Sequence, residues 1–187
     1  MKNSLLCIAC MFIFISGAFA QNDSIQDPYK KDNEIKINAV FLLVGAFEAS
    51  YERNLSETSS VGISMLIPFD EENFDTDLNY YVSPYYRIFF GKKYASGFFL
   101  EGFGMVSSYD DRNSFFTGNE FDPTLVTTEE TFTNVALGFG LGGKWVIKNG
   151  FVFELTSGIG RNIINNSRDN QDFQFVGKFG FNLGYRF

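Results

Sequence analysis

The sequence predicts an all-β protein, an eight-stranded antiparallel up-and-down transmembrane β-barrel. From residue 35 onward, apolar residues alternate with polar residues or glycine at period two, the spacing of strands with two unlike faces. Aromatic residues make up 18% of the chain, more than a soluble core of this size needs. No stretch beyond the N-terminal region approaches the about 18 consecutive apolar residues of a helical span, which leaves strands to cross a bilayer.

Residues 1–20 are expected to be a cleaved signal peptide. Lys2 supplies a positive start, residues 5–19 are an apolar run too short for a spanning helix, and residues 18–20 form a small-x-small cleavage site. Both cysteines, Cys7 and Cys10, fall inside this segment. Acylation of Cys10 in a lipoprotein is the alternative, but the apolar run continues past it, which favours cleavage after residue 20.

The polar residues 21–34 are expected to form a flexible periplasmic leader, and residues 35–187 to form the barrel. The first three strands are predicted at 35–43, 46–54 and 60–68, where the polar parity carries Lys36 and Asn38, then Glu48, Ser50 and Glu52, then Gly62 and Ser64. The fourth strand sets one parity, Tyr80, Val82, Tyr86, Ile88 and Phe90, against the other, Asn79, Tyr81, Ser83, Tyr85 and Arg87.

The fifth strand, about 96–109, carries Phe on both parities, and Glu101 marks one of them as polar. The sixth strand, 134–147, and the seventh, from residue 151, alternate more cleanly. The eighth strand is the clearest, because one parity holds only large apolar residues: Phe175, Phe179, Phe181, Leu183, Tyr185 and Phe187.

The expected connections differ in length at the two ends of the barrel. Those at 55–59, 91–95 and 148–150 are short, and the last contains the Asn-Gly pair of a tight hairpin. On the other side, 44–45 is short, whereas 69–77, 110–131 and about 160–173 are long loops. Short periplasmic turns and longer external loops are the asymmetry of outer-membrane barrels.

A soluble barrel is the alternative fold. It would place its larger apolar face inward. Here the polar parity, rich in Gly, Ser, Asn and charge, would make a poor core. The apolar parity is nearly free of charge, which fits contact with lipid, where a charge at mid-depth costs about 2–4 kcal/mol.

The C-terminal pattern, with Phe187 last and Tyr185 two residues before it, resembles the signal read by the barrel-assembly machinery. Together with the signal peptide and eight strands, it resembles the small outer-membrane barrels, the OmpX- and OmpA-like families among them. Asn182 departs from that signal, since a glycine is common there. No domain is expected after the barrel, so an OmpA-like peptidoglycan anchor is not expected either.

We expect no enzyme, no catalytic residue and no cofactor. The chain has no histidine, the usual base near neutral pH. The outer-membrane barrel enzymes, among them lipid A acyltransferases, phospholipase A and omptin proteases, resemble one another in using a catalytic histidine. The chain has neither a Gly-x-Ser-x-Gly elbow nor a phosphate loop. A formal net charge of −7 argues against nucleic acid as a partner.

Charged residues of the inward parity are predicted to form a lumen network. The interior of an eight-stranded barrel is only wide enough for side chains, so these charges must pair. A narrow or gated ion path is the alternative. The predicted members are Lys36, Glu48, Glu52, Arg87, Glu101, Lys144, Glu154, Lys178 and Arg186.

Two further features are singled out. The first is an acidic loop, a weak Ca²⁺ candidate without EF-hand spacing, better explained as a solvated loop: Asp70, Glu71, Glu72, Asp75 and Asp77. The second is an aromatic girdle expected at the membrane–water boundaries: Tyr51, Tyr94, Trp145 and Tyr185.

The sequence therefore predicts a non-enzymatic barrel in the outer membrane of a Gram-negative bacterium. It is expected to be a monomer that supports envelope integrity or surface interaction through its acidic external loops. Its expected partners are outer-membrane lipid, lipopolysaccharide bridged through divalent ions, and the barrel-assembly machinery. A porin-like channel for small solutes or ions is the alternative function.

Overall fold

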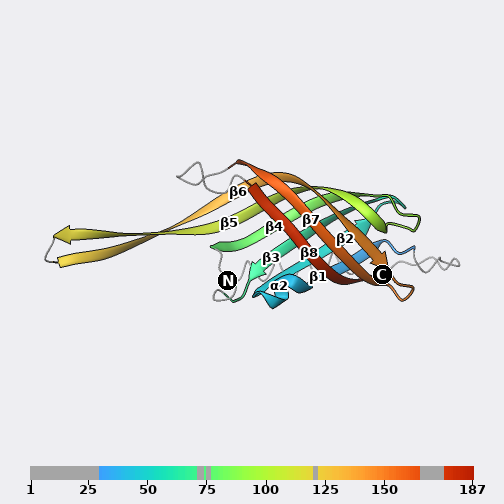
Figure 1. The fold of residues 1–187 in the computed structure, drawn as a ribbon, viewed down its shortest axis with the longest axis horizontal. Helices are drawn as coiled ribbons and strands as arrows, with labels where there is room; N and C mark the ends of the chain where they lie inside the picture. The colour runs from blue at the N-terminus through green and yellow to red at the C-terminus, as the bar shows by residue number, and fades with distance from the viewer. Residues whose placement is uncertain (1–29, 71–73, 75–76, 120–121, 165–174) are drawn as a thin grey trace, which may run out of the picture.

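The computed structural model describes residues 30–187, except for 71–73, 75–76, 120–121 and 165–174. The described strands form a closed barrel in chain order (Figure 1). Every neighbouring pair is antiparallel, and β1 pairs with β8 to close the cylinder, so the predicted eight-stranded up-and-down barrel is confirmed. The elements are β1 (Asn33–Asn38), α2 (Ala39–Leu43), β2 (Ala46–Asn54), β3 (Ser59–Pro68), β4 (Leu78–Phe89), β5 (Gly97–Asn119), β6 (Asp122–Val146), β7 (Phe151–Ile164) and β8 (Phe175–Arg186).

The first strand differs from the prediction at both of its ends. It begins at Asn33, so the last two residues assigned to the leader belong to the barrel. It ends at Asn38, because the Asn38 side chain accepts a hydrogen bond from the Val40 amide at 3.1 Å and caps a short helix, α2. The prediction of a strand through residue 43 was therefore wrong. No helix of the described residues is long and apolar enough to cross a membrane.

The segment 110–131 was predicted to be a loop, and this too was wrong. Strands β5 and β6 continue through most of it as a two-stranded ribbon, paired from Gly97 opposite Lys144 to Asn119 opposite Asp122. Figure 1 shows this hairpin extending well beyond the other strands. The segment is rich in threonine and other strand-favouring residues, a preference that its acidic residues obscured in the sequence.

The two ends of the barrel have different connections. At one end, which we call the turn end, short connections at 55–58, 90–96 and 147–150 join the strands, as predicted. The long β5–β6 hairpin and α2 lie at the opposite end, which we call the hairpin end. The expected asymmetry of the connections is thus present.

The polarity of the barrel is inverted relative to a soluble protein. Along β7 Phe151, Phe153 and Leu155 are exposed and Glu154 is fully buried. Along β4 Ile88 is 47% exposed whereas Arg87 is 2% exposed. The same alternation holds along β2, β3 and β8. The assignment of the two parities made from the sequence is therefore correct.

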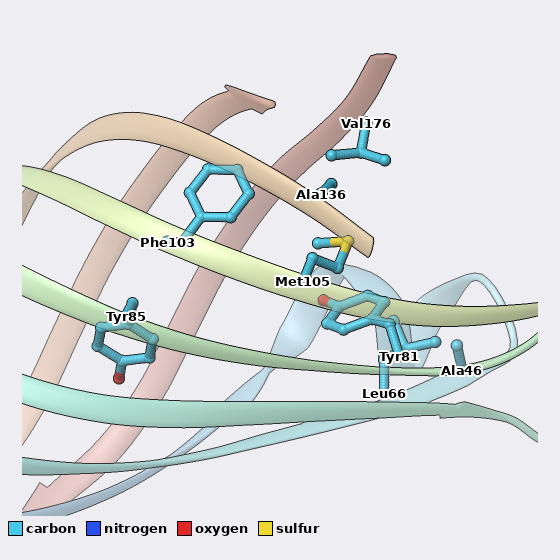
Figure 2. Close-up of a cluster of buried hydrophobic side chains, with 8 residues drawn as sticks. All are labelled: Ala46, Leu66, Tyr81, Tyr85, Phe103, Met105, Ala136 and Val176. Carbon is cyan, nitrogen blue, oxygen red and sulfur yellow. The ribbon is translucent and has the colours of Figure 1, made fainter. Parts of the chain in front are cut away.

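The interior also contains apolar residues. Toward the hairpin end, Leu66, Tyr81 and Met105 belong to one buried apolar cluster (Figure 2). Phe41 of α2 packs against this cluster. At the turn end, a second cluster consists of Phe89, Ala95 and Phe99, with Tyr94 packed against it. Charged side chains fill the barrel between these two apolar clusters.

Candidate functional site

The nine residues predicted for the lumen network are all buried in the interior. Each is 8% exposed or less. Glu34, which the sequence interpretation placed in the leader, is fully buried among them. Among the described residues, the buried interior therefore contains five basic residues, Lys36, Arg87, Lys144, Lys178 and Arg186, and five acidic ones, Glu34, Glu48, Glu52, Glu101 and Glu154.

The centre of the network is Arg87. Its Nε lies 2.7 Å from Oε2 of Glu101, which faces it across β4 and β5. Its Nη1 lies 2.7 Å from one oxygen each of Glu52 and Glu154, and Nη2 donates to the other oxygen of Glu154 at 3.0 Å. The guanidinium carbon lies 4.3 Å from the ring centroids of both Tyr85 and Phe99. Arg87 thus satisfies its donors with three carboxylates while two aromatic rings pack on it.

Two lysines share the same carboxylates on the side facing the turn end. Lys36 Nζ lies 2.5 Å from Glu52 and 2.7 Å from Glu154. Lys144 pairs with Glu52 and lies 3.0 Å from Oε2 of Glu34. Because isolated buried charges are expensive, this sharing is what allows so many charges in so narrow a cylinder.

Arg186 and Glu34 join the two ends of the barrel sheet. They face each other across β1 and β8, with Arg186 Nε 2.7 Å from Oε1 of Glu34. The same guanidinium donates to the backbone oxygens of Tyr94 at 2.9 Å and Ala95 at 2.7 Å, in the β4–β5 turn. This contact fastens the turn across the turn end of the barrel.

Lys178 and Glu48 lie further toward the hairpin end. Lys178 Nζ lies 2.6 Å from Glu101. Glu48 accepts a hydrogen bond from the Asn38 amide at 2.6 Å and makes no ion pair within 4.0 Å among the described residues. Glu48 is therefore inside the lumen as predicted but not part of the ion-paired network.

Side chains fill the described part of the lumen. Beside Glu48, Lys178 and Asn182, the interior leaves a cavity of about 10 Å³, the volume of about one water molecule. The apolar clusters described above lie toward the two ends of this interior.

A family model described as "Protein of unknown function (DUF3575)" matches residues 6–183. The chain belongs to this family. Among solved structures, it is similar to the outer membrane protein Ail of Yersinia pestis in a phospholipid bilayer nanodisc, with 17% identity and a TM-score of 0.38. That match covers 84% of this chain and 100% of Ail. No curated protein matches.

In this DUF3575 barrel, three of the four predicted girdle aromatics lie on the outer wall near the turn end. Tyr51 is 44% exposed, Trp145 59% and Tyr185 41%. Tyr51 and Tyr185 flank Ile35 in register, and the Tyr185 ring meets Phe151 edge-on at 5.9 Å. Their role at a membrane boundary stays a prediction.

The fourth girdle residue, Tyr94, is placed differently. It folds back onto the apolar cluster at the turn end, and its hydroxyl donates to Asp32 at 2.8 Å. A turn residue has no strand parity, so the pattern did not predict this. Partial burial and the Asp32 carboxylate together raise the pKa of the Tyr94 phenol to about 12.

The acidic loop is only partly within the described residues. Of its five acids, Asp70 and Asp77 are described, and Glu71, Glu72 and Asp75 lie outside. Among the residues that the structure describes, no three His, Cys, Asp or Glu side chains form a possible metal site. The predicted signal peptide, residues 1–20, also lies outside the described residues.

The sequence interpretation missed two aromatic residues of the interior, Phe99 and Phe103, and one of its acids, Glu34. Phe99 and Phe103 share the parity of Glu101, and a strict use of that parity would have placed them inside. Room for these rings comes from β6, where a Cβ on Gly142 would lie 2.5 Å from Phe99 Cζ and one on Gly138 2.4 Å from Phe103 Cζ. Glu34 shares the parity of Lys36. It was not predicted to be in the interior because the barrel was expected to begin at residue 35.

Proposed function

We propose that this protein is a non-enzymatic outer-membrane barrel of a Gram-negative bacterium that anchors and presents the β5–β6 hairpin at the cell surface. The observation that carries the proposal is the inverted polarity: an exposed apolar wall around a buried, ion-paired interior. In water such a wall would be a large aggregation-prone surface, whereas in a bilayer it is solvated by acyl chains. A closed barrel also satisfies every strand edge, as the hydrocarbon region requires.

The asymmetry of the two ends supports an orientation. Short turns face the periplasm in outer-membrane barrels, and long connections face outward. By this rule the turn end of the barrel is periplasmic and the hairpin end is external.

The hairpin is suited to contact a partner. Pairing of β4 with β5 ends at Leu78 opposite Tyr109, and pairing of β6 with β7 ends at Val135 opposite Ile164. Within the described residues, 111–119 and 122–130 pair only with each other. Nine residues at about 3.3 Å each project about 30 Å beyond the barrel. Both edges of this ribbon offer backbone donors and acceptors for an added strand of a partner.

The closed interior disfavours the channel. A conducting path needs a continuous polar space, whereas the cavity beside Glu48 and Lys178 measures about 10 Å³. The ion pairs stabilise the closed barrel instead. Its charges are neutralised locally, as expected for a structural network.

The acidic external residues suggest lipopolysaccharide as a neighbour. Asp70, Asp77 and Asp110 lie at the hairpin end, where divalent cations would bridge carboxylates and anionic headgroups. Calorimetry of the folded barrel should show weak Ca²⁺ binding. Heat signals identical to those of a Ca²⁺ titration into buffer would remove this part of the proposal.

Topology labelling tests the presentation of the hairpin. An epitope inserted between Asn119 and Asp122 should bind antibody on intact cells. The matched control, the same epitope placed after Glu57 in the β2–β3 turn, should become accessible only after the outer membrane is permeabilised. The reverse pattern, or labelling of neither site in whole cells, would contradict the proposal.

A further inference from the structure

Two hollows in the outer wall meet near the turn end. The first, of about 370 Å³, is an apolar groove over strands β5 to β8. The second, of about 300 Å³, lies where the β4–β5 turn approaches the end of β6. Gly97 and Trp145 line both, so the two hollows form one continuous depression. The groove is lined chiefly by Phe98, Leu141, Gly143, Trp145, Leu155 and Phe179.

The groove exists because Gly143 interrupts the apolar wall. It lies between Leu141 and Trp145 on the outward parity of β6, and faces Phe98 on β5 and Leu155 on β7. Each of those four neighbours is at least 47% exposed. A Cβ on Gly143 would lie 2.8 Å from Cη2 of the Trp145 ring, which shows that the indole leans over the glycine. The missing side chain therefore leaves a trough roofed at one end by the indole.

The second hollow is basic. Lys92 and Lys93 in the β4–β5 turn line it, and both are exposed. They belong to a wider excess of positive charge at the turn end. The described exposed or partly exposed basic residues there are Lys30, Lys31, Arg53, Lys92, Lys93 and Lys148, against the acids Asp32 and Glu57.

We infer that this depression binds an anionic phospholipid of the membrane leaflet at the turn end. The phosphate lies against Lys92 and Lys93, and an acyl chain lies in the trough over Gly143 beneath the Trp145 ring. The inference rests on the proposed membrane location. In addition to that location, the inference assigns one lipid class to one position on the outer wall.

Charge and shape complementarity both support this occupant. The lysine ammonium group binds a phosphate by acting as a point charge. Each basic residue near an anionic lipid surface strengthens binding to that surface by about 1 kcal/mol. A trough of apolar side chains alone would accept any acyl chain without preference. A third hollow, apolar and of about 540 Å³, lies over β1, β7 and β8. No exposed lysine pair lines it, so it is not expected to prefer an anionic lipid.

The chain itself carries the probe. Trp145 is its single tryptophan. Quenching of Trp145 fluorescence by brominated acyl chains therefore reports contact at this groove alone. The protein is reconstituted in phosphatidylcholine vesicles, and brominated phosphatidylglycerol or brominated phosphatidylcholine is added at increasing mole fraction.

Brominated phosphatidylglycerol should quench at a mole fraction about thirtyfold lower than brominated phosphatidylcholine, because two lysines at about 1 kcal/mol each contribute about 2 kcal/mol. The Lys92→Ala/Lys93→Ala variant should lose that preference, and Lys92→Arg/Lys93→Arg should retain it. Lys30→Ala/Arg53→Ala removes two positive charges at the same end away from the groove and should leave the preference unchanged.

Gly143→Leu should fill the trough and weaken quenching by both brominated lipids. Gly102→Leu is its control, because it adds the same side chain to the outer wall where a Cβ meets nothing within 4 Å. Equal quenching by the two lipids in the inserted wild-type barrel would overturn the lipid assignment and leave the membrane location intact. Failure of the folded barrel to enter vesicles would overturn both.

Discussion

Arg186 on β8 donates from Nε to Oε1 of Glu34 on β1 at 2.7 Å, across the seam that closes the barrel. Arg186 is fully buried, as is Glu34, which also lies 3.0 Å from Lys144. The first and last strands are therefore joined by an ion pair as well as by backbone hydrogen bonds. The stability of the closed barrel is therefore expected to depend on the Glu34 carboxylate.

Glu34→Ala should destabilise the barrel by about 3–5 kcal/mol, because it removes a buried carboxylate that pairs with both the Arg186 guanidinium and Lys144. Urea unfolding in detergent or vesicles measures the change. Glu57→Ala removes an exposed acid from the same end and should shift the free energy of unfolding by less than about 0.5 kcal/mol. Equal stabilities of Glu34→Ala and the wild type would show that the seam pair is dispensable.

Two buried glutamates should respond differently to neutralisation. Glu101→Gln removes the negative charge that pairs with both Lys178 and Arg87 Nε, so a loss of about 3–5 kcal/mol is expected. Glu48→Gln keeps the hydrogen bond from Asn38 and breaks no ion pair, so about 1 kcal/mol or less is expected. The two variants compared in one unfolding series test whether ion pairing or burial alone sets the cost.

The inward glycines should tolerate no added volume. Gly138→Ala would place a Cβ 2.4 Å from Phe103 Cζ and 2.7 Å from the Ile159 oxygen, so overpacking should cost about 1–3 kcal/mol. Gly102→Ala on the outer wall should be near neutral, within about 0.5 kcal/mol. Similar losses in both variants would point to strand propensity rather than interior packing.

Alkaline pH should weaken the turn end through Tyr94. Its pKa is raised to about 12 from an ordinary value of 10.0, so the folded protein favours the protonated phenol. Its contribution to stability is full below about pH 10 and is lost as pH rises toward 12. Tyr94→Phe should remove this part of the alkaline decline, seen as a difference between the two unfolding profiles. Parallel profiles would exclude the contribution.

The sequence predicted most of the fold because period-two alternation reports the two faces of each strand directly. Arg87 and Glu101 were placed together inside on parity alone, and they face each other in register. Phe99 and Phe103 were missed because hydrophobicity on both parities obscures the inward face. Helix α2 was missed because the Asn38 cap is a local hydrogen bond that alternation does not register.

The hairpin and Tyr94 show a different limit. The polarity of residues 110–131 was interpreted as a loop, yet a ribbon surrounded by water needs no apolar face. The position of Tyr94 depends on the path of a turn held by Arg186, a contact between residues 92 apart in the chain. Such long-range contacts are not visible in a local pattern.

The hairpin beyond the barrel should be removable. Replacing residues 111–130 by Asn-Gly would join Asp110 and Thr131, which are opposite each other in register, through a tight two-residue turn. Because the removed residues pair only among themselves within the described chain, the barrel's midpoint of unfolding should change little. Loss of the folded barrel would show that the ribbon stabilises it. A folded barrel that lacks the hairpin can then be compared with the wild type to identify partners that bind the hairpin.

Single-channel recording in planar bilayers tests whether ion pairs and apolar clusters close the interior of this barrel to ions. Insertion is verified beforehand by the faster migration of the folded protein in unheated gels. With insertion established, we expect no steady conductance above that of the bare bilayer. Stable conductance steps proportional to voltage, present in the wild type at neutral pH, would contradict it.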